Sequence, residues 1–172
     1  VYSLQLVVQA AMKVLKKHPK SLFVVVGNHG LQRWKAQVRE AGVERRFLFT
    51  GVVPHSKVPR YVAAADICVN MFSGENYFAA AHPVKILEYM ACGKPVVATN
   101  LPGTAQTVRN GFNGFLYPPG DVEAFAARLD ELISNDRLRS RLGDNAWATV
   151  KAGYSWEALT ERLAAIIEEV KG

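Results

Sequence analysis

The sequence predicts an α/β fold, a Rossmann-like parallel sheet with helices on both of its faces. The first observation is that short apolar runs alternate with single amphipathic segments along the chain. The second is that one helix separates successive strands, which makes those strands parallel. The third is that no repeat, low-complexity tract or linker interrupts the alternation, so the 172 residues are expected to form a single domain, 1–172.

Each predicted strand is a short apolar run, and each predicted helix carries its apolar residues on one face. In chain order we predict a helix from Ser3 to just before Pro19, a strand at 22–26, a helix at 31–41, a strand at 47–50, a helix at 56–64, a strand at 66–71, a helix at about 83–91, strands at 95–99 and 114–117, and helices at 121–133, 136–150 and 156–170.

Helix caps and burial patterns justify the elements of the first third. Ser3 is a good N-cap for the first helix. LFVVV (22–26), which Gly27 closes, is wholly apolar, so this strand is expected to be covered on both faces. The residues expected to face inward from the first two helices are Leu4, Val7, Val8, Ala11, Val14, Leu15, Leu31, Trp34 and Val38.

The later elements are justified in the same way. The apolar strands 66–71 and 95–99 flank the helix at 83–91. Asp121 has the position of an N-cap and Glu123 that of an acid in the first helical turn, so the chain is expected to be helical from there onward.

The composition excludes several classes of protein. No apolar stretch approaches the roughly 20 residues that a membrane span needs, and the amphipathic N-terminal segment lacks a signal-peptide cleavage site. Cys68 and Cys92 lie in apolar contexts, so we expect small buried thiols in a reducing, cytoplasmic compartment and no disulfide. The four histidines show no ligand spacing with each other or with the cysteines, so we expect no metal and no other cofactor.

The positive charge is concentrated in the first third of the chain. Residues 1–60 hold 11 Lys or Arg against two acids, whereas residues 61–172 hold ten against 13. Such a basic segment attracts nucleic acid, an anionic membrane or a phosphorylated small ligand, or forms solvated helix faces. Aromatic residues are not interleaved with the basic ones, which disfavours nucleic acid. Peripheral contact with an anionic membrane stays open.

Ligands of parallel sheets bind at the carboxyl ends of the strands, so the residues that follow the strands are candidates for a site. Gly27 and Gly30 flank two polar residues between a strand and a helix, where the backbone can approach a phosphate or a sugar. The motif is not G-x-G-x-x-G, and a plain strand-to-helix turn is an equal alternative. Pro102, Gly103 and Thr104 also follow a strand directly and are expected to border the site.

The start of the helix at 83–91 carries a second signal. Pro83 suits a first helical turn, and the amides of Val84 and Lys85 then point towards an anion at the helix end. A lysine at a helix N-terminus has the unfavourable sign for the helix dipole, which favours an anionic ligand. Glu88 lies one turn later on the same face, where a carboxylate can accept two vicinal ribose hydroxyls. The alternative is an exposed Lys85–Glu88 pair worth about 0.2–0.5 kcal/mol.

The chain resembles the C-terminal, donor-binding half of retaining GT-B glycosyltransferases of group 1 (family 4). The resemblance runs almost from end to end and is specific only as a whole. It is carried by FVVVGNHG, RRFLFTGVV, VPRYVAAADICVNMF, PVKILEYMACGKPVVAT, GTAQTVRNGFNGFLYPPGD and NAWATVKAGYSW.

This resemblance implies a nucleotide-sugar donor, usually of UDP, GDP or ADP. Glu88 would hold the ribose hydroxyls, and the backbone at Val52 and Val53 would read the base. The helix end at residues 83–85 would hold the diphosphate. Gly27 and Asn28 would also line the cleft.

The chain departs from the family pattern in two ways. Members with a two-glutamate motif carry a Glu eight positions before the ribose-binding one, where Ala80 stands here, and Glu75 is a speculative substitute as a catalytic or sugar-binding residue. The resemblance also implies a central first strand, with phosphate-binding basic residues, and a whole acceptor-binding N-terminal domain ahead of residue 1.

The resemblance therefore implies that the chain is the larger part of a donor domain, inactive alone. Its parent would transfer a sugar from a nucleotide, with UDP or GDP favoured, to a glycan or lipid-linked acceptor. The partners would be the nucleotide sugar and the N-terminal domain. The alternative is a non-catalytic nucleotide-sugar-binding or scaffold module of the same fold, which Ala80 favours.

Overall fold

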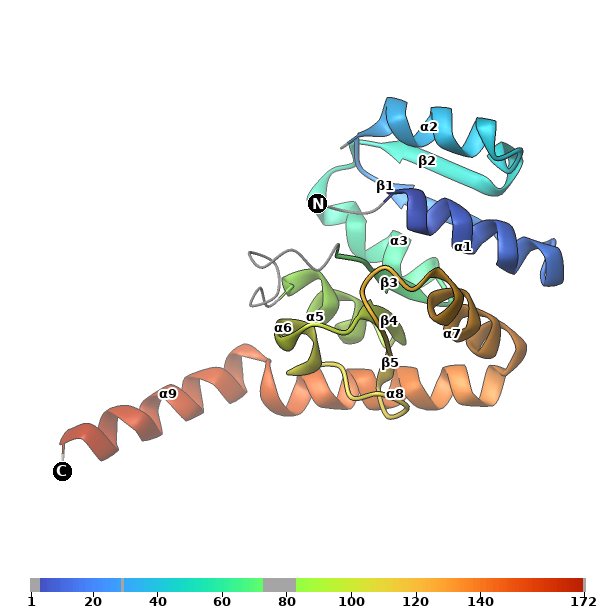
Figure 1. Cartoon of the computed structure of the whole chain (residues 1–172). Helices are drawn as coiled ribbons and strands as arrows, with labels where there is room; N and C mark the ends of the chain where they lie inside the picture. The colour runs from blue at the N-terminus through green and yellow to red at the C-terminus, as the bar shows by residue number, and fades with distance from the viewer. Residues whose placement is uncertain (1–3, 29, 73–82, 172) are drawn as a thin grey trace.

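The computed structural model describes residues 4–28, 30–72 and 83–171 (Figure 1). The main helices lie at the positions that the sequence pattern predicts, and short helical turns add to them. The helices are α1 (Leu4–Lys17), α2 (Leu31–Glu40), η1 (Glu44–Arg46), η2 (His55–Lys57), α3 (Val58–Ala64), α5 (Val84–Ala91), α6 (Pro102–Ala105), α7 (Val122–Ser134), α8 (Asp136–Gly153) and α9 (Trp156–Lys171). The strands are β1 (Phe23–Val26), β2 (Phe47–Gly51), β3 (Cys68–Asn70), β4 (Val96–Thr99) and β5 (Gly114–Tyr117).

Within the part of the chain that the structure describes, the strands form two parallel sheets, where the sequence pattern predicted one. β1 pairs with β2, and β4 lies between β3 and β5. Figure 1 shows the strands from top to bottom in the order β2, β1, β3, β4, β5. The sheet is divided between β1 and β3, which is the place where the family resemblance puts a central strand. All strand pairs given for the described residues are parallel, so the predicted α/β class is confirmed.

The prediction that strand 22–26 is covered on both faces is wrong. Burial alternates along β1, and Val24 and Val26 are 46% and 40% exposed. Leu48, the register partner of Val24 on β2, is 48% exposed. Phe23 and Val25 instead face the core. One face of the β1–β2 sheet is therefore covered by helices, and the other shows apolar side chains to solvent.

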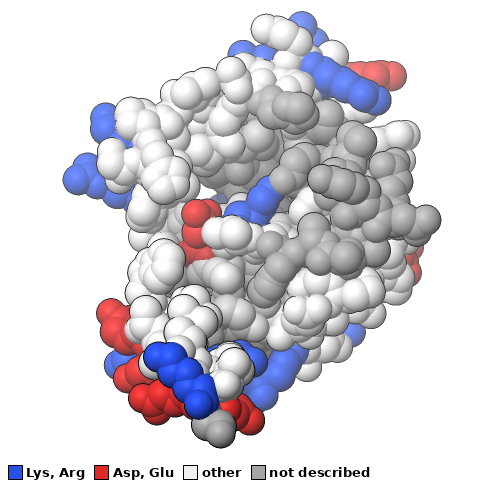
Figure 2. All heavy atoms as spheres, turned by 90° about the vertical axis from the view of Figure 1, so that its left-hand side faces the viewer, with Lys and Arg blue, Asp and Glu red and all other residues white. Residues whose placement is uncertain are grey.

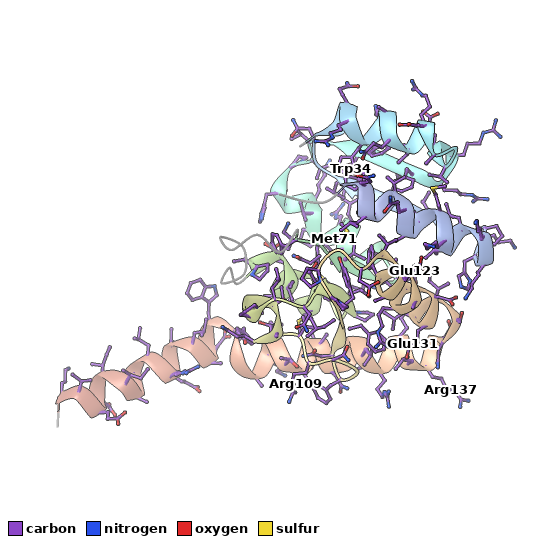
Figure 3. All side chains as sticks on the ribbon, in the orientation of Figure 1. Trp34, Met71, Arg109, Glu123, Glu131 and Arg137 are labelled. Atoms are coloured by element: carbon purple, nitrogen blue, oxygen red, sulfur yellow. The ribbon has the colours of Figure 1, made fainter. Side chains whose placement is uncertain are left out.

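A single main core joins the two sheets. It contains Phe47 of β2 together with Val97 and Phe115 of β4 and β5. The predicted inward residues Trp34 and Val38 of α2 are buried in it, and Figure 3 shows Trp34 beneath its helix. The first helix contributes Val7, Val8, Ala10, Ala11 and Val14. On the opposite side of the β3–β4–β5 sheet, Ile86 and Met90 of α5 pack in a smaller cluster with Val96, Ala98, Val108 and Ala146.

Asp130 of α7 ties the end of α1 to the rest of the domain. Its carboxylate accepts a hydrogen bond from Lys17 Nζ at 2.5 Å and lies 2.7 Å from His18 Nε2. These contacts, the Lys17 bond first, lower the pKa of the Asp130 carboxyl below its usual range. The side chain is 28% exposed, which limits the energy of the pair.

We therefore expect Asp130→Asn to destabilise the chain at pH 7 by less than about 1 kcal/mol. A lowered pKa means that the contribution of Asp130 is present above the ordinary pKa and is lost as the pH falls through the folded value. The melting temperatures of the variant and the unchanged chain should converge between pH 7 and pH 3. Asp144→Asn, an exposed acid of α8, is the control. A gap that persists at low pH would contradict the assignment.

Candidate functional site

The carboxyl ends of the strands and the N-terminal end of α5 lie on the left-hand side of Figure 1. Figure 2 turns this face towards the viewer and shows a hollow near its middle, where acidic and basic atoms lie beside each other and beside atoms that are not described. The candidate residues that follow β1 and β2, and those that begin α5, belong to this edge of the fold.

The turns after β1 and β2 are joined by their backbones. The Gly27 amide donates to the Gly51 carbonyl at 2.9 Å, and Gly27 has φ of 116°, a conformation that side chains rarely adopt. Asn28 is exposed, and its carbonyl accepts from Leu31 at the start of α2. The residues that follow β1 and those that follow β2 thus meet at Gly27 and Gly51.

Val52 and Val53 follow this junction on the β2 side. Val52 is 74% exposed and Val53 is half-buried. A large aliphatic side chain in this position is costly to expose and offers a flat contact for a ring. The position is therefore compatible with a ligand base that lies against the turn.

The first turn of α5 presents a positive end. Pro83 is its buried N-cap, one residue outside the helix, with extended backbone angles of −76° and 106°. Val84 is 67% exposed, and Lys85 is half-buried with its Nζ 5.9 Å from the centre of the Phe72 ring. The first amides of a helix have no intrahelical acceptors, and the dipole adds positive potential there.

Glu88 lies one turn further along α5. Its side chain is exposed, and the structure gives it no ion pair or hydrogen bond within the described residues. The alternative of a Lys85–Glu88 surface salt bridge is therefore not supported, because the described ion pairs do not include one. The Glu88 carboxylate is available to accept hydrogen bonds from a ligand.

The two sets of candidate residues lie on separate sheets at the same edge. Gly27, Asn28, Val52 and Val53 belong to the β1–β2 sheet, and residues 83–88 precede β4 of the other sheet. The speculative Glu75 and the departure at Ala80 lie outside the described residues, so their placement stays untested.

A buried polar network behind this edge was not predicted from the sequence. The Thr99 hydroxyl accepts from the Phe72 amide at 3.0 Å and lies 3.1 Å from the Tyr117 hydroxyl. Burial raises the pKa of Tyr117 to about 12. Thr104 of α6 donates to the Thr99 carbonyl, and α6 itself was not predicted. The network fixes Phe72, whose ring lies under Lys85.

We expect Thr99→Val to destabilise the chain by about 1–3 kcal/mol, because it leaves the Phe72 amide and the Tyr117 hydroxyl without this buried partner. Urea denaturation would measure the change. Thr160→Val, which removes an exposed hydroxyl bonded only within α9, is the matched control and should change stability far less. Equal effects of the two substitutions would show that the Thr99 network does not hold this edge.

The described residues also bear on metals, membranes and cysteines. No group of three or more His, Cys, Asp or Glu within the described ranges could hold a metal ion. Among the helices of those ranges, none is long and apolar enough to cross a membrane. Both cysteines are free thiols. The predicted burial is confirmed for Cys68, where it raises the pKa to about 12, and is wrong for Cys92, which is half-buried.

The chain is similar in sequence to one protein family and to several known proteins. Residues 2–149 match the model of the family described as glycosyl transferases group 1. The chain is 30% identical over 174 residues to a D-inositol 3-phosphate glycosyltransferase of Corynebacterium jeikeium, covering 96% of the chain but 40% of that relative. It is 29% identical over 148 residues to a phosphatidyl-myo-inositol mannosyltransferase of Mycobacterium leprae, covering 86% of the chain and 37% of that protein.

Solved structures share the fold. The Anabaena protein Alr3699/HepE in complex with UDP superimposes with a TM-score of 0.83 at 24% identity, over 96% of this chain and 44% of that one. The C-terminal domain of the group 1 glycosyl transferase LpcC of Francisella tularensis gives 0.73 at 28% identity, over 88% and 79%. The chain thus spans about 40% of the curated relatives and most of a separately crystallised C-terminal domain.

Proposed function

The chain belongs to the glycosyl transferases group 1 family, and from this premise we propose that it is the nucleotide-sugar-binding part of a retaining glycosyltransferase. The parent enzyme transfers a sugar from a UDP or GDP sugar to a glycan or lipid-linked acceptor. The donor diphosphate lies at the N-terminus of α5, and the ribose hydroxyls bind to Glu88. The base lies against Val52 and Val53.

The observation that carries this proposal is the arrangement of opposite polarities on α5. Its first turn offers amide donors and Lys85, while Glu88, one turn later, offers a carboxylate that has no ion pair or hydrogen bond with the described residues. A diphosphate needs donors and a ribose diol needs an acceptor, and a nucleoside diphosphate presents these two groups next to each other. UDP is the first probe because the similar Anabaena protein was solved with UDP.

The test is an NMR titration of the 172-residue chain with UDP and GDP up to millimolar concentration. Amide shifts at residues 83–88 are expected with at least one nucleotide, and weaker shifts there with uridine, which lacks phosphate. An absence of shifts at these residues with either nucleotide would overturn the proposal for this chain.

We also propose that α9 contacts the acceptor-binding domain of the same polypeptide. Figure 1 shows α9 extending away from the body of the domain, and the helix has no buried residue. Exposed apolar side chains recur along it every three or four residues, and we name this set the α9 stripe: Trp156, Leu159, Leu163, Ile166 and Val170. The greater length of the curated relatives leaves room for a domain that covers the stripe.

In the 172-residue chain we expect the α9 stripe to cause concentration-dependent self-association, since exposed apolar stripes drive association. Leu163→Lys should reduce it without lowering the melting temperature, because Leu163 is 57% exposed. Sedimentation velocity over a range of concentrations would measure the effect. Glu161→Lys adds the same residue to the polar side of α9 as a control. A lower melting temperature for Leu163→Lys would instead show that the stripe packs on its own domain.

The basic segment supports a further proposal, peripheral contact of a cytoplasmic protein with an anionic membrane. A surface hollow of about 450 Å³ near the ends of α1 and α2 is lined by three arginines, one acid and an apolar wall: Arg39, Arg45, Arg46, Glu44, which pairs with Arg39, and Leu15 and Pro19 among the apolar residues. Co-sedimentation with phosphatidylglycerol-containing vesicles, and not with purely zwitterionic ones, is the expected result. Equal sedimentation with both would overturn the proposal.

A further inference from the structure

Asn70, the last residue of β3, has a side-chain amide that nothing in the described residues satisfies. The residue is 1% exposed, and neither its Oδ1 nor its Nδ2 has a hydrogen-bond partner there. Asn113 is the internal comparison. It is equally buried, yet its amide bonds to the Arg109 amide, the Thr107 carbonyl and the Thr149 hydroxyl. Buried carboxamides are normally satisfied in this way, so the orphaned Asn70 calls for a partner.

The strand geometry places Asn70 on the side of the sheet that α5 covers. Side chains alternate along a strand, so Asn70 shares a face with Cys68. Its register partner is Ala98 of β4, which packs in the small cluster with Ile86 and Met90 of α5. The crossover from β3 through α5 to β4 brings the N-terminal turn of α5 over the carboxyl end of β3. Asn70 thus lies below the beginning of α5.

The groups that converge at this point are hydrogen-bond donors or carry positive potential. The helix supplies its first amides and the positive end of its dipole. Lys85, in the first turn, extends over Phe72, two residues after Asn70. The Asn70 Nδ2 adds two further N–H donors. An anion with several acceptor oxygens complements these donors, and it leaves the Asn70 Oδ1, an acceptor that also has no partner in the described residues, unsatisfied.

We propose, on the basis of the function proposed above, that Asn70 Nδ2 donates a hydrogen bond to the diphosphate of the nucleotide bound at the N-terminus of α5. An apolar side chain would suit this buried position better in the unliganded chain, where the amide is desolvated without compensation. The free energy lost by desolvating the Asn70 amide is then regained when the amide bonds to the nucleotide. Asn70→Leu should therefore have two opposite effects, greater stability and weaker nucleotide affinity.

The experiment compares the unchanged chain, Asn70→Leu and Cys68→Val by thermal melting and by NMR titration with UDP, GDP and uridine. Cys68→Val alters the same buried face two residues away and removes no amide. Asn70→Leu should melt at a higher temperature and bind the better of the two nucleotides about three- to tenfold more weakly. Its response to uridine should be unchanged. In the unchanged chain, the Asn70 side-chain amide signal should shift with the nucleotide and stay in place with uridine.

Two failures can be distinguished. If neither nucleotide shifts residues 83–88 of the unchanged chain, the proposed function fails and this inference fails with it. If residues 83–88 shift while the Asn70 side-chain signal does not, or if Asn70→Leu binds as tightly as Cys68→Val, this inference alone is overturned. Because the side-chain signal is read in the unchanged chain, the result does not depend on folding of the variant.

Discussion

Glu88→Gln is expected to weaken binding of the preferred nucleoside diphosphate by about tenfold or more. A carboxylate can accept both ribose hydroxyls with charge-assisted bonds, whereas the glutamine amide accepts through one oxygen only and carries no charge. Each lost bond of this kind is worth roughly 1.5–3 kcal/mol, and 1.4 kcal/mol corresponds to a factor of ten. Because Glu88 is exposed, the lower end of this range applies.

The same prediction can be made specific to the ribose by varying the ligand. The unchanged chain should bind 2′-deoxy-UDP more weakly than UDP, if UDP is the preferred nucleotide, and Glu88→Gln should bind the two about equally. NMR titration gives all four affinities. Glu40→Gln, an exposed glutamate at the end of α2, is the matched control and should keep the discrimination. A Glu88→Gln chain that still discriminates between the two ligands would assign the ribose to another residue.

Local sequence patterns predicted the helices and strands well because their bounds depend on interactions between residues that are close in the sequence. Asp121 was predicted as the N-cap of the helix after residue 120, and its Oδ1 accepts the Ala124 amide at 2.8 Å. Strand 114–117 has the predicted bounds. The predicted helix 56–64 begins instead as the 3-10 turn η2 and becomes α-helical only at Val58. Pro59 at the start of α3 restricts the preceding residue and favours this late start.

The division of the sheet could not be read from the apolar runs. LFVVV (22–26) predicts a buried strand because such a run suits coverage on both faces, but coverage depends on neighbouring elements that are distant in the sequence. Among the strands of the described residues, β1 pairs with β2 only, and the second face of β1 exposes Val24 and Val26 to solvent. Pairing partners, and hence which strand is an edge, are properties of the tertiary fold.

The site shows the same limit. Glu88 and the start of α5 were predicted, since the sign of Lys85 at a helix N-terminus is a local signal. Thr99 and Asn70 were not, because their importance comes from lateral neighbours across the sheet. Thr99 meets Phe72 and Tyr117, which lie 27 and 18 residues away. Asn70 looks like one more strand residue until its burial and its lack of a partner are seen together.

The helix that carries Glu88, α5, ends in close contact with α8. Gly143, in the middle of α8, packs against the backbone of Gly93, which follows the C-cap of α5. A Cβ on Gly143 would lie 2.3 Å from the Gly93 carbonyl oxygen, closer than real contacts allow. Since the obstacle is backbone, a side-chain rotation cannot relieve it. The two helices must separate or the turn at Gly93 must move.

Gly143→Ala is therefore expected to destabilise the chain by about 1–3 kcal/mol, although alanine is normally the better helix former by about 1 kcal/mol. Gly153→Ala supplies the matched control in the same helix, because a Cβ there meets nothing within 4 Å. That variant should be as stable as the unchanged chain or more stable by up to about 1 kcal/mol. Urea denaturation measures the free energy of unfolding of both variants, and opposite signs of the two changes exclude an effect of helix propensity.

Since the clash acts on the turn that ends α5, Gly143→Ala should also weaken nucleotide binding at Glu88, whereas Gly153→Ala should not. Equal stability of the two variants would mean that α8 does not press on the end of α5.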